Sequence, residues 1–276
     1  MKKFELTSET KINIFGKKLF RIKALISFAD VEAGETGGWV EKEGNVNQSG
    51  NAWVYGDAMV YGNAMVSGDA MVYGNAEVYG DAEVSGNAKV SGDAKVYGDA
   101  MVYGDAEVSG DAMVYGNAMV SGDAEVSGNA KVYGDAMVYG NAEVYGDAKV
   151  SGDAEVSGNA KVSGDAKVYG DAMVSGDAEV SGDAEVSGNA KVYGDAMVYG
   201  DAMVSGDADY TTIHGFGTQF RTTTFFRCKD KKVRVACGCF FGTIPEFREQ
   251  VKNTRKGKIA EEYLMIADLM ENHFEK

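Results

Sequence analysis

The sequence is poor in proline and histidine and has no long apolar run. It contains only 1 proline and 2 histidines among 276 residues, although it has 37 glycines. Many glycines with almost no proline indicate a regular structure with many similar turns rather than a disordered linker. No stretch approaches the ~18 consecutive apolar residues of a membrane-spanning helix, and the start MKKFELTSETKIN lacks the apolar core of a signal peptide. We therefore expect a folded protein without a membrane span or a signal peptide.

Cysteine and positive charge are also scarce. The 3 cysteines, Cys228, Cys237 and Cys239, lie in one short segment. An odd, clustered set fits a reducing compartment better than a disulfide framework, so we expect a cytoplasmic protein. The 42 acidic residues outnumber the 27 Lys and Arg, and the formal net charge of -15 argues against direct binding of free nucleic acid.

The abundant feature is a six-residue repeat. Residues 50–205 read as 26 consecutive hexads of the form Gly-Asp/Asn-Ala-x-Val-Tyr/Ser, with one Trp and no insertion. The Ala-x-Val alternation points Ala and Val inward and x outward, while Gly and Asp or Asn suit a corner. One hexad is therefore one short strand plus one corner, and three hexads close a triangular coil of 18 residues. The repeat predicts an all-β solenoid of nearly nine coils, roughly 42 Å long at the ~4.8 Å spacing of stacked strands.

The hexads resemble the hexapeptide-repeat, left-handed parallel β-helix family. In that family an aliphatic residue, here Val54 or Val60, follows a small residue, here Ala52 or Ala58, by two positions. The resemblance implies the left-handed sense. The family contains acyltransferases, γ-class carbonic anhydrases and non-catalytic scaffolds, so the fold leaves the function open. Residues 30–58 and 222–252 resemble uncharacterised bacterial and phage proteins that often carry a transferase label, which implies a phage-associated context.

Composition divides the chain into three parts: an N-terminal β cap over residues 1–49, the β-helix over 50–210 and a C-terminal α+β module over 211–276. Caps are expected because the exposed strand edges of a solenoid aggregate unless covered. In the first part, KFEL, KINIF and KLFRIKALISF read as strands. Residues 44–49 are a degenerate hexad with Gln48 in the valine position.

The C-terminal module contains both strand and helix signals. Strands over residues 222–228 and 233–240 flank the polar KDKK turn and predict a hairpin. Thr243 and Glu246 form a capping box that predicts a helix start. A second helix is expected from residue 259 to about residue 273, because its apolar residues recur at helical spacing.

Residues that lie 18 apart in the sequence stack as neighbours along the rod. One corner then carries an uninterrupted tyrosine ladder, which consists of Tyr61, Tyr79, Tyr97, Tyr115 and Tyr133. Each stacked pair contributes ~0.5–1 kcal/mol. The ladder either only stabilises the solenoid or also offers a binding strip, since tyrosine is a favoured interface residue.

The x positions form three further rows. An exposed row of methionines is expected as a contact surface for a partner or a second copy, unless it reflects only drift of the repeat. Rows of like charge must be solvated, paired laterally or met by a partner. The methionine row is Met65, Met101, Met119, Met137 and Met173; the glutamate row is Glu107, Glu125 and Glu143; the lysine row is Lys131, Lys149 and Lys167.

The hexads concentrate the charge and lack catalytic residue types. They hold 17 Asp and 8 Glu against 7 Lys and contain no histidine. Along the rod this is one net charge per ~2.3 Å, near the one per ~1.7 Å of duplex DNA. The excess acid either serves solubility or imitates a nucleic acid. Acyl transfer on this fold needs a general base, usually histidine, and the metal of the carbonic anhydrases needs histidine ligands.

We therefore predict a non-catalytic acidic scaffold that needs no metal or cofactor and binds a protein partner. In the sharpest form of this hypothesis the rod mimics nucleic-acid charge and occupies a basic nucleic-acid-binding protein. A self-assembling rod, with the chain as a homo-oligomer, is a second hypothesis. An acyltransferase-like enzyme with its site in the terminal module is a third.

The terminal module leaves two further alternatives open. Cys228, Cys237, Cys239 and His214 offer zinc-ligand types, but Cys-x-Cys is not the usual knuckle spacing, and buried apolar cysteines are the simpler interpretation. Alternation places Cys237 and Cys239 on one face of the predicted strand. Residues 211–258 carry 11 Lys and Arg against 3 Asp and Glu, with Phe216, Phe220, Phe225, Phe226, Phe240 and Phe241 between them. This composition suits either single-stranded nucleic acid or a core whose basic residues are solvated or complement the acidic rod.

Overall fold

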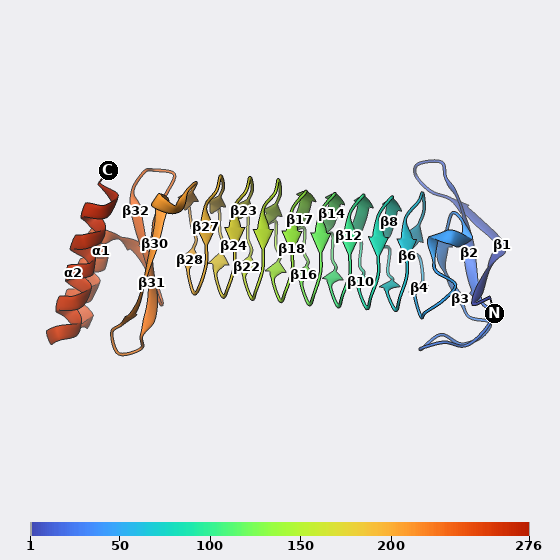
Figure 1. The fold of residues 1–276 in the computed structure, drawn as a ribbon, viewed down its shortest axis with the longest axis horizontal. Helices are drawn as coiled ribbons and strands as arrows, with labels where there is room; N and C mark the ends of the chain where they lie inside the picture. The colour runs from blue at the N-terminus through green and yellow to red at the C-terminus, as the bar shows by residue number, and fades with distance from the viewer. Residues whose placement is uncertain (1, 276) are drawn as a thin grey trace.

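The 26 hexads form 26 short strands that wind into a parallel β-solenoid, as the computed structural model shows for residues 2–275 (Figure 1). The predicted fold class is thus confirmed: about nine coils of 18 residues form a straight rod between an N-terminal β cap and a small α+β module. Every Ala and Val of the hexads, from Ala52 to Val204, is fully buried. The core is therefore built from only two small residue types, in the alternation that the sequence predicted.

The rod has three faces, which we name after their outward side chains. The tyrosine face extends from the N-terminal cap and contains β5 (Met59–Val60), β8 (Glu77–Gly80), β11 (Lys95–Gly98), β14 (Met113–Gly116), β17 (Lys131–Gly134), β20 (Lys149–Val150), β23 (Lys167–Val168), β26 (Glu185–Val186) and β29 (Met203–Val204).

The glutamate face contains β4 (Trp53–Val54), β7 (Met71–Val72), β10 (Lys89–Val90), β13 (Glu107–Val108), β16 (Glu125–Val126), β19 (Glu143–Val144), β22 (Lys161–Val162), β25 (Glu179–Val180) and β28 (Met197–Val198). The methionine face contains β6 (Met65–Val66), β9 (Glu83–Val84), β12 (Met101–Val102), β15 (Met119–Val120), β18 (Met137–Val138), β21 (Glu155–Val156), β24 (Met173–Val174) and β27 (Lys191–Val192).

Backbone hydrogen bonds join each coil to the next at strands and corners alike. Met101 N donates to Ala118 O at 3.0 Å within a face, and Asp105 N donates to Gly122 O at 2.9 Å at a corner. The corner glycines have positive φ, and Gly116 at 74° lies directly against Gly134 of the next coil. A Cβ on Gly116 would come within 3.1 Å of the backbone nitrogen of Gly134. Glycine is thus required both for the left-handed conformation and for the close approach of successive coils.

The N-terminal cap continues the tyrosine face beyond the first coil. It contains β1 (Phe4–Ile12), β2 (Lys18–Ala24), β3 (Thr36–Val40) and the short helix η1 (Glu43–Asn45). β1 and β2 pair antiparallel, and β3 pairs parallel with β5 of the rod. The prediction of separate strands in KFEL and KINIF is wrong, because residues 4–12 form the single strand β1, which absorbs the intervening polar residues through a register shift between Leu6 and Thr10, and residues 13–15 of KINIF lie in the turn.

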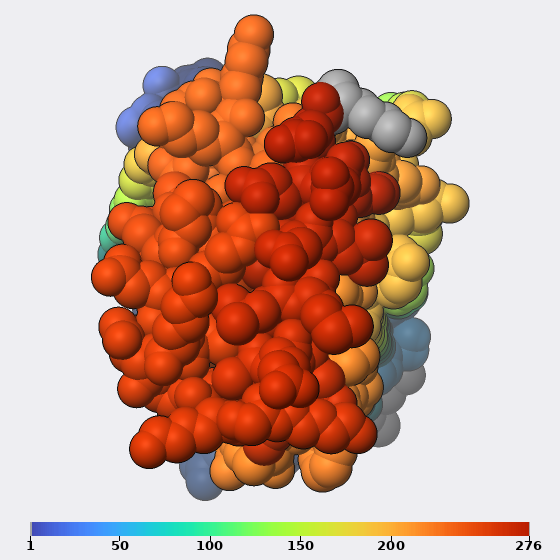
Figure 2. All heavy atoms as spheres, turned by 90° about the vertical axis from the view of Figure 1, so that its left-hand side faces the viewer, coloured from blue at the N-terminus to red at the C-terminus, as the bar shows by residue number. Residues whose placement is uncertain are grey.

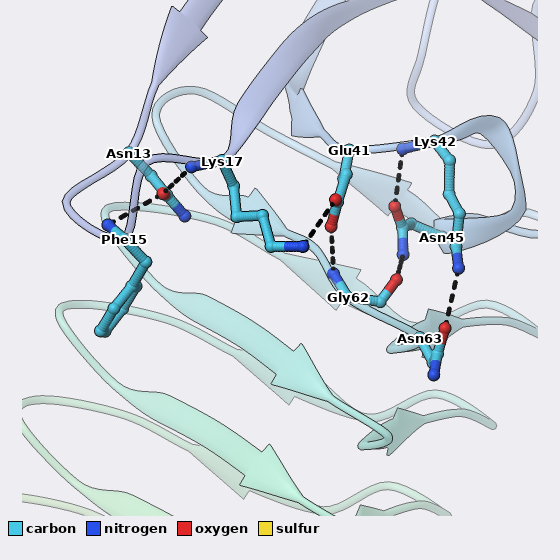
Figure 3. A network of polar contacts seen from close by, with 8 residues as sticks. All are labelled: Asn13, Phe15, Lys17, Glu41, Lys42, Asn45, Gly62 and Asn63. Atoms are coloured by element: carbon cyan, nitrogen blue, oxygen red, sulfur yellow. Dashed lines mark hydrogen bonds and ion pairs between the residues drawn. The ribbon is translucent and has the colours of Figure 1, made fainter.

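Polar side chains fasten this cap to the first coils (Figure 3). Asn13 Oδ1 accepts hydrogen bonds from the backbone nitrogens of Phe15 and Lys17 and closes the β1–β2 turn. Glu41 accepts one from Gly62 N at 2.7 Å and pairs with Lys17 at 3.1 Å. Because these bonds hold the hairpin against the rod, the ring of Phe15 lies over the tyrosine ladder, with its centroid 6.0 Å from that of Tyr79.

The C-terminal module covers the last coil. It begins with η2 (Asp207–Asp209), followed by an antiparallel sheet and two helices. The sheet lies between the rod and the helices, and it covers the end of the rod when seen along the axis (Figures 1 and 2). Its elements are β30 (Tyr210–Phe216), β31 (Arg221–Arg227), β32 (Val233–Cys237), β33 (Phe240–Thr243), α1 (Ile244–Thr254) and α2 (Gly257–Phe274).

Both predicted helices are confirmed, and Thr243 with Glu246 forms the capping box of α1. Two strand predictions in this module need correction. β30 was not foreseen, and the strand predicted over residues 233–240 is two strands, because Gly238 at φ 59° turns the chain between β32 and β33. The turn gives the sheet four strands, and β31 covers the last coil with Phe226 and Thr224 buried beneath it.

Candidate functional site

The tyrosine ladder exists as predicted. Successive rings from Tyr61 to Tyr133 lie parallel within 2°, with centroid separations of 5.0, 4.8, 4.9 and 5.0 Å. The stack also changes the backbone: β8, β11, β14 and β17 extend for four residues through their tyrosines, whereas the other rod strands have two. The ring contacts therefore hold the tyrosine corners of successive coils in register.

The N-terminal end of the ladder is closed to solvent. Tyr61 is only 4% exposed, and its hydroxyl donates to Glu77 Oε2 at 2.7 Å. Glu77 also pairs with Lys95 at 3.1 Å. Burial raises the pKa of Tyr79 to about 12, with a smaller contribution from the negative charge of Glu77, so its phenol stays protonated at neutral pH. Tyr79, Tyr97, Tyr115 and Tyr133 are half-buried and form an accessible edge.

The methionine row is in register but is less exposed than expected. Met101, Met119 and Met137 stand directly opposite one another in successive strands. These three and Met173 are half-buried, and of the row only Met65, at 41%, is exposed. The expectation of an exposed row is therefore wrong, because flexible side chains stacked in register bury one another's flanks.

The glutamate row is partly neutralised along the rod axis. Glu107, Glu125 and Glu143 are stacked as predicted. Glu107 pairs with Lys89 at 2.8 Å and Glu143 with Lys161 at 3.0 Å, each from a neighbouring coil. Glu125, between them, is exposed and has no ion pair within the described residues. Lysines in neighbouring coils thus reduce the repulsion between the stacked glutamates. The sequence pattern alone did not identify these lysines as their partners.

The lysine row lines a shallow groove of about 460 Å³ on the tyrosine face. Lys131, Lys149 and Lys167 stand in register, and Lys229 of the terminal module joins them in the groove. Lys167 and Lys229 both pair with Glu185 at 3.2 Å, and the two lysines lower the pKa of that carboxyl against the opposing effect of its burial. Within residues 2–275, Lys131 and Lys149 have no carboxylate at ion-pair distance.

The corners carry a feature that sequence reasoning missed. Most hexad asparagines donate a side-chain hydrogen bond to the Asp or Asn one coil further on, as from Asn63 to Asp81 at 2.9 Å and from Asn129 to Asp147 at 2.9 Å. These amides separate stacked carboxylates. The signal was visible, because every hexad asparagine except Asn141 is followed 18 residues later by aspartate.

The hexad aspartates nevertheless form no ion pairs within residues 2–275. Four of the seven hexad lysines pair with hexad glutamates. Across the described part of the chain, no ion pair involves any of the 17 hexad aspartates. The negative charge of the rod is therefore concentrated in its corner ladders, which face solvent or a partner.

The cysteines do not gather into one site. Cys228 is buried under the last coil, and burial raises the pKa of its thiol to about 11. Cys237 is half-buried at the end of β32 and accepts a hydrogen bond from Thr223 Oγ1 at 3.1 Å. Cys239 is exposed in the turn, so the expectations that it is buried and that it shares a strand face with Cys237 are wrong. Among residues 2–275, no group of three or more His, Cys, Asp or Glu side chains is placed to hold a metal ion.

Within the described part of the chain, five of the 11 basic residues in residues 211–258 pair with acids of the same chain. Arg227 pairs with Asp209, Arg234 with Asp230, and Arg248 with Asp268 and Glu271. Phe225 and Phe226 are fully buried. The buried phenylalanines and these ion pairs favour the interpretation of a core whose basic residues are partly paired and partly solvated, although Phe220 and Phe241 are exposed.

The stacked coils, the uniform core and the two caps define a class of protein: a capped parallel β-solenoid built from repeats. Six stretches of the rod match the family model described as YdcK Beta solenoid repeat, namely residues 52–68, 58–74, 106–122, 112–128, 130–146 and 190–206. No curated protein matches the sequence. No helix in the described residues has the length and apolar character needed to span a membrane.

Proposed function

We propose that the protein is a non-catalytic acidic scaffold that binds a basic protein partner along the corners of its rod. The observation that carries this proposal is the absence of any ion pair to the 17 hexad aspartates within residues 2–275, although four of the seven rod lysines pair with glutamates. Charge repeated at a fixed pitch along a rigid rod attracts a partner that presents basic residues at similar spacing.

The sharpest form of the proposal is charge mimicry. A nucleic-acid-binding protein recognises closely spaced phosphates largely through Lys and Arg, independently of base sequence. The corner aspartates supply a comparable density of carboxylates on a rigid support. The flanks resemble phage-encoded proteins, which adds the expectation that the partner is a protein of the host cell. The half-buried methionine row supplies apolar surface next to the charge.

A matched pair of variants tests the proposal. The rod variant carries Asp147→Asn, Asp165→Asn and Asp183→Asn, which the fold tolerates because Asn75 and Asn129 already occupy this corner. The control variant carries Glu249→Gln, Glu261→Gln and Glu275→Gln on the exposed side of the terminal helices, so both variants have the same net charge.

Each immobilised full-length protein is exposed to host lysate at low and high salt, and the captured proteins are identified. We expect basic nucleic-acid-binding proteins on the wild type and the control, less on the rod variant, and release at high salt, where the screening length falls from ~10 Å to ~3 Å. A captured protein should then be displaced by duplex DNA. Equal capture by both variants, or capture that high salt does not reduce, would contradict the proposal.

A further inference from the structure

The terminal module contains a partly open pocket that the proposed function does not use. It has a volume of about 90 Å³ and lies between the C-terminal end of α1, the start of α2, and the loops that join β30 to β31 and β32 to β33. This volume holds a few water molecules or a small polyatomic ion. Both helices lie on the far side of the sheet from the last coil (Figure 1). No residue of the rod hexads lines the pocket, so it does not depend on the rod surface.

Two guanidinium groups at this pocket have no acidic partner. Arg221 from the start of β31 and Arg255 after α1 both line it, and within the described residues neither guanidinium group makes a hydrogen bond or an ion pair. In contrast, Arg234 and Arg248 of the same module are paired with carboxylates at 2.8 and 2.7 Å. An arginine without an acid is an available donor for a planar or tetrahedral oxyanion.

Both guanidiniums line the pocket together with the phenol of Tyr263. Burial raises the pKa of the Tyr263 phenol, and the positive charges of Arg255 and Arg221 oppose this shift. The Tyr263 hydroxyl donates to Phe216 O at 3.2 Å and is thereby fixed in position. The pocket therefore combines two cations with an oriented phenol.

Two glycines lie against the Arg221 and Tyr263 side chains, at positions where a Cβ would clash. Gly238, at φ 59°, lies under the Arg221 side chain, where a Cβ would come 2.5 Å from Nη1. Gly217, at φ 73°, lies under Tyr263, where a Cβ would come 2.5 Å from the hydroxyl oxygen. Both loops thus have glycine where the guanidinium or the phenol lies against the backbone. The exposed thiol of Cys239 belongs to the β32–β33 turn, next to Gly238.

We infer that this pocket binds a small oxyanion, either a phosphate, a sulfate or a carboxylate group, between Arg221 and Arg255. Two guanidiniums provide forked N–H donors that match the oxygens of such a group, and the net charge of residues 211–258, with 11 Lys and Arg against 3 Asp and Glu, favours its approach. The thiol of Cys239, which lines the same pocket, would be shielded by the bound ion.

The test titrates inorganic phosphate, sulfate and acetate into the full-length protein by calorimetry, at constant ionic strength set with chloride. We expect at least one of the three ions to bind, and Arg221→Gln or Arg255→Gln to weaken that binding by about tenfold to a hundredfold, as for the loss of a charged hydrogen bond. Lys252→Gln on α1 removes the same charge without lining the pocket and should leave the affinity unchanged. Comparing the affinities of the three ions identifies which oxyanion the pocket binds most tightly.

Alkylation of the cysteines provides a second, local readout. The ion that binds should slow the reaction of Cys239 with iodoacetamide, followed by mass spectrometry, in wild type and Lys252→Gln but not in Arg221→Gln. Lys149→Gln, in the groove of the rod, shows whether the ions bind there instead of in the terminal module. The inference is overturned if none of the ions binds or protects Cys239, or if binding is lost in Lys149→Gln and retained in both arginine variants.

Discussion

Gln48 and Phe4 are joined by two hydrogen bonds that imitate the pairing of neighbouring strands. Gln48 Oε1 accepts from Phe4 N at 3.2 Å, and Gln48 Nε2 donates to Phe4 O at 3.2 Å. The same Oε1 accepts from Lys3 N at 2.8 Å. In the degenerate hexad that precedes the rod, a carboxamide at the valine position thus binds the start of β1 and covers an otherwise open edge.

Gln48→Val should weaken the cap although it restores the residue usual at this position. The variant loses three hydrogen bonds to the backbone of Lys3 and Phe4. We expect the free energy of unfolding to fall by about 1–3 kcal/mol, because buried backbone groups lose their partner. Urea denaturation measures this change, and light scattering should show faster aggregation from the uncovered end. An unchanged midpoint and unchanged scattering would mean that Gln48 does not fasten the cap.

Tyr97→Ser should cost more than the same substitution outside the ladder. The Tyr97 ring stacks on Tyr79 and on Tyr115, at 4.8 and 4.9 Å. Tyr103 is exposed at another corner, so Tyr103→Ser is the matched control. We expect a loss of about 1–2 kcal/mol for Tyr97→Ser beyond the control, from two aromatic pairs, in urea denaturation. Equal losses would show that the ladder adds nothing to stability.

Gly116→Ala and Gly194→Ala separate two reasons for glycine at the corners. Both residues have positive φ, at 74° and 67°. A Cβ on Gly116 meets the backbone of Gly134 at 3.1 Å, whereas a Cβ on Gly194 has no atom within 4 Å. We expect Gly194→Ala to lose about 1–2 kcal/mol from backbone strain alone. Gly116→Ala should lose roughly 1–3 kcal/mol more from crowding between coils.

Thermal unfolding of the two glycine variants, followed by circular dichroism, measures the difference. Similar melting temperatures for both would show that conformation alone selects glycine at the corners and that coil spacing adjusts freely.

Lys3 should make the stability of the cap depend on pH. Its side chain is 2% exposed, and Nζ donates to Gly50 O at 3.2 Å and to Ala52 O at 2.8 Å. Burial lowers the pKa of Lys3 to about 8, against the attraction of Asp69. Between about pH 8 and the ordinary pKa of 10.5, the unfolded chain therefore binds more protons at this residue than the folded chain.

Stability relative to Lys3→Met should consequently rise as the pH increases from about 8 to 10.5 and should fall back as the pH decreases through 8. The rise amounts to at most about 3 kcal/mol. The neutral amine keeps two N–H donors for the two carbonyl oxygens, so the hydrogen bonds survive deprotonation. Urea denaturation of both proteins between pH 7 and pH 10.5 gives the difference, and parallel pH profiles would exclude Lys3 as its source.

The methionine face provides a test of self-association. Met101→Lys, Met119→Lys and Met137→Lys together place three like charges in register on half-buried positions. If a second copy binds this face, we expect the triple variant to be a monomer where the wild type is an oligomer, because a desolvated row of ammonium groups is unfavourable in an interface. Analytical ultracentrifugation measures both masses, and identical masses would remove this face as a site of self-association.

Much of the rod was predictable because the repeat makes every contact local. Ala52 and Val54 recur every six residues, so one assignment of inward positions holds for all 26 hexads, and the stacking of Tyr61 on Tyr79 follows from a spacing of one coil. The capping box of Thr243 and Glu246 was equally legible, since it involves neighbours in the chain. The asparagine-to-aspartate bonds followed the same spacing and were visible in the sequence, although they were not predicted.

The features that escaped prediction join residues far apart in the chain or depend on how much space surrounds a side chain. Lys3 reaching Ala52, and Lys229 reaching Glu185, cannot be read from a period. Arg221 and Arg255 line one pocket because two loops of the sheet and the two helices meet there. The half-burial of Met119 depends on the volume of the methionines above and below it, which position alone does not specify.

The sequence by itself determined the repeat, the inward and outward residues and the strong charge of the rod. A short period repeated without interruption allows Ala and Val to be buried in only one arrangement. The tertiary structure decided how the ends are covered, which charges are paired and where a pocket forms. These outcomes depend on contacts between the non-repeating flanks and the rod, and their distances are set only when the whole chain has folded.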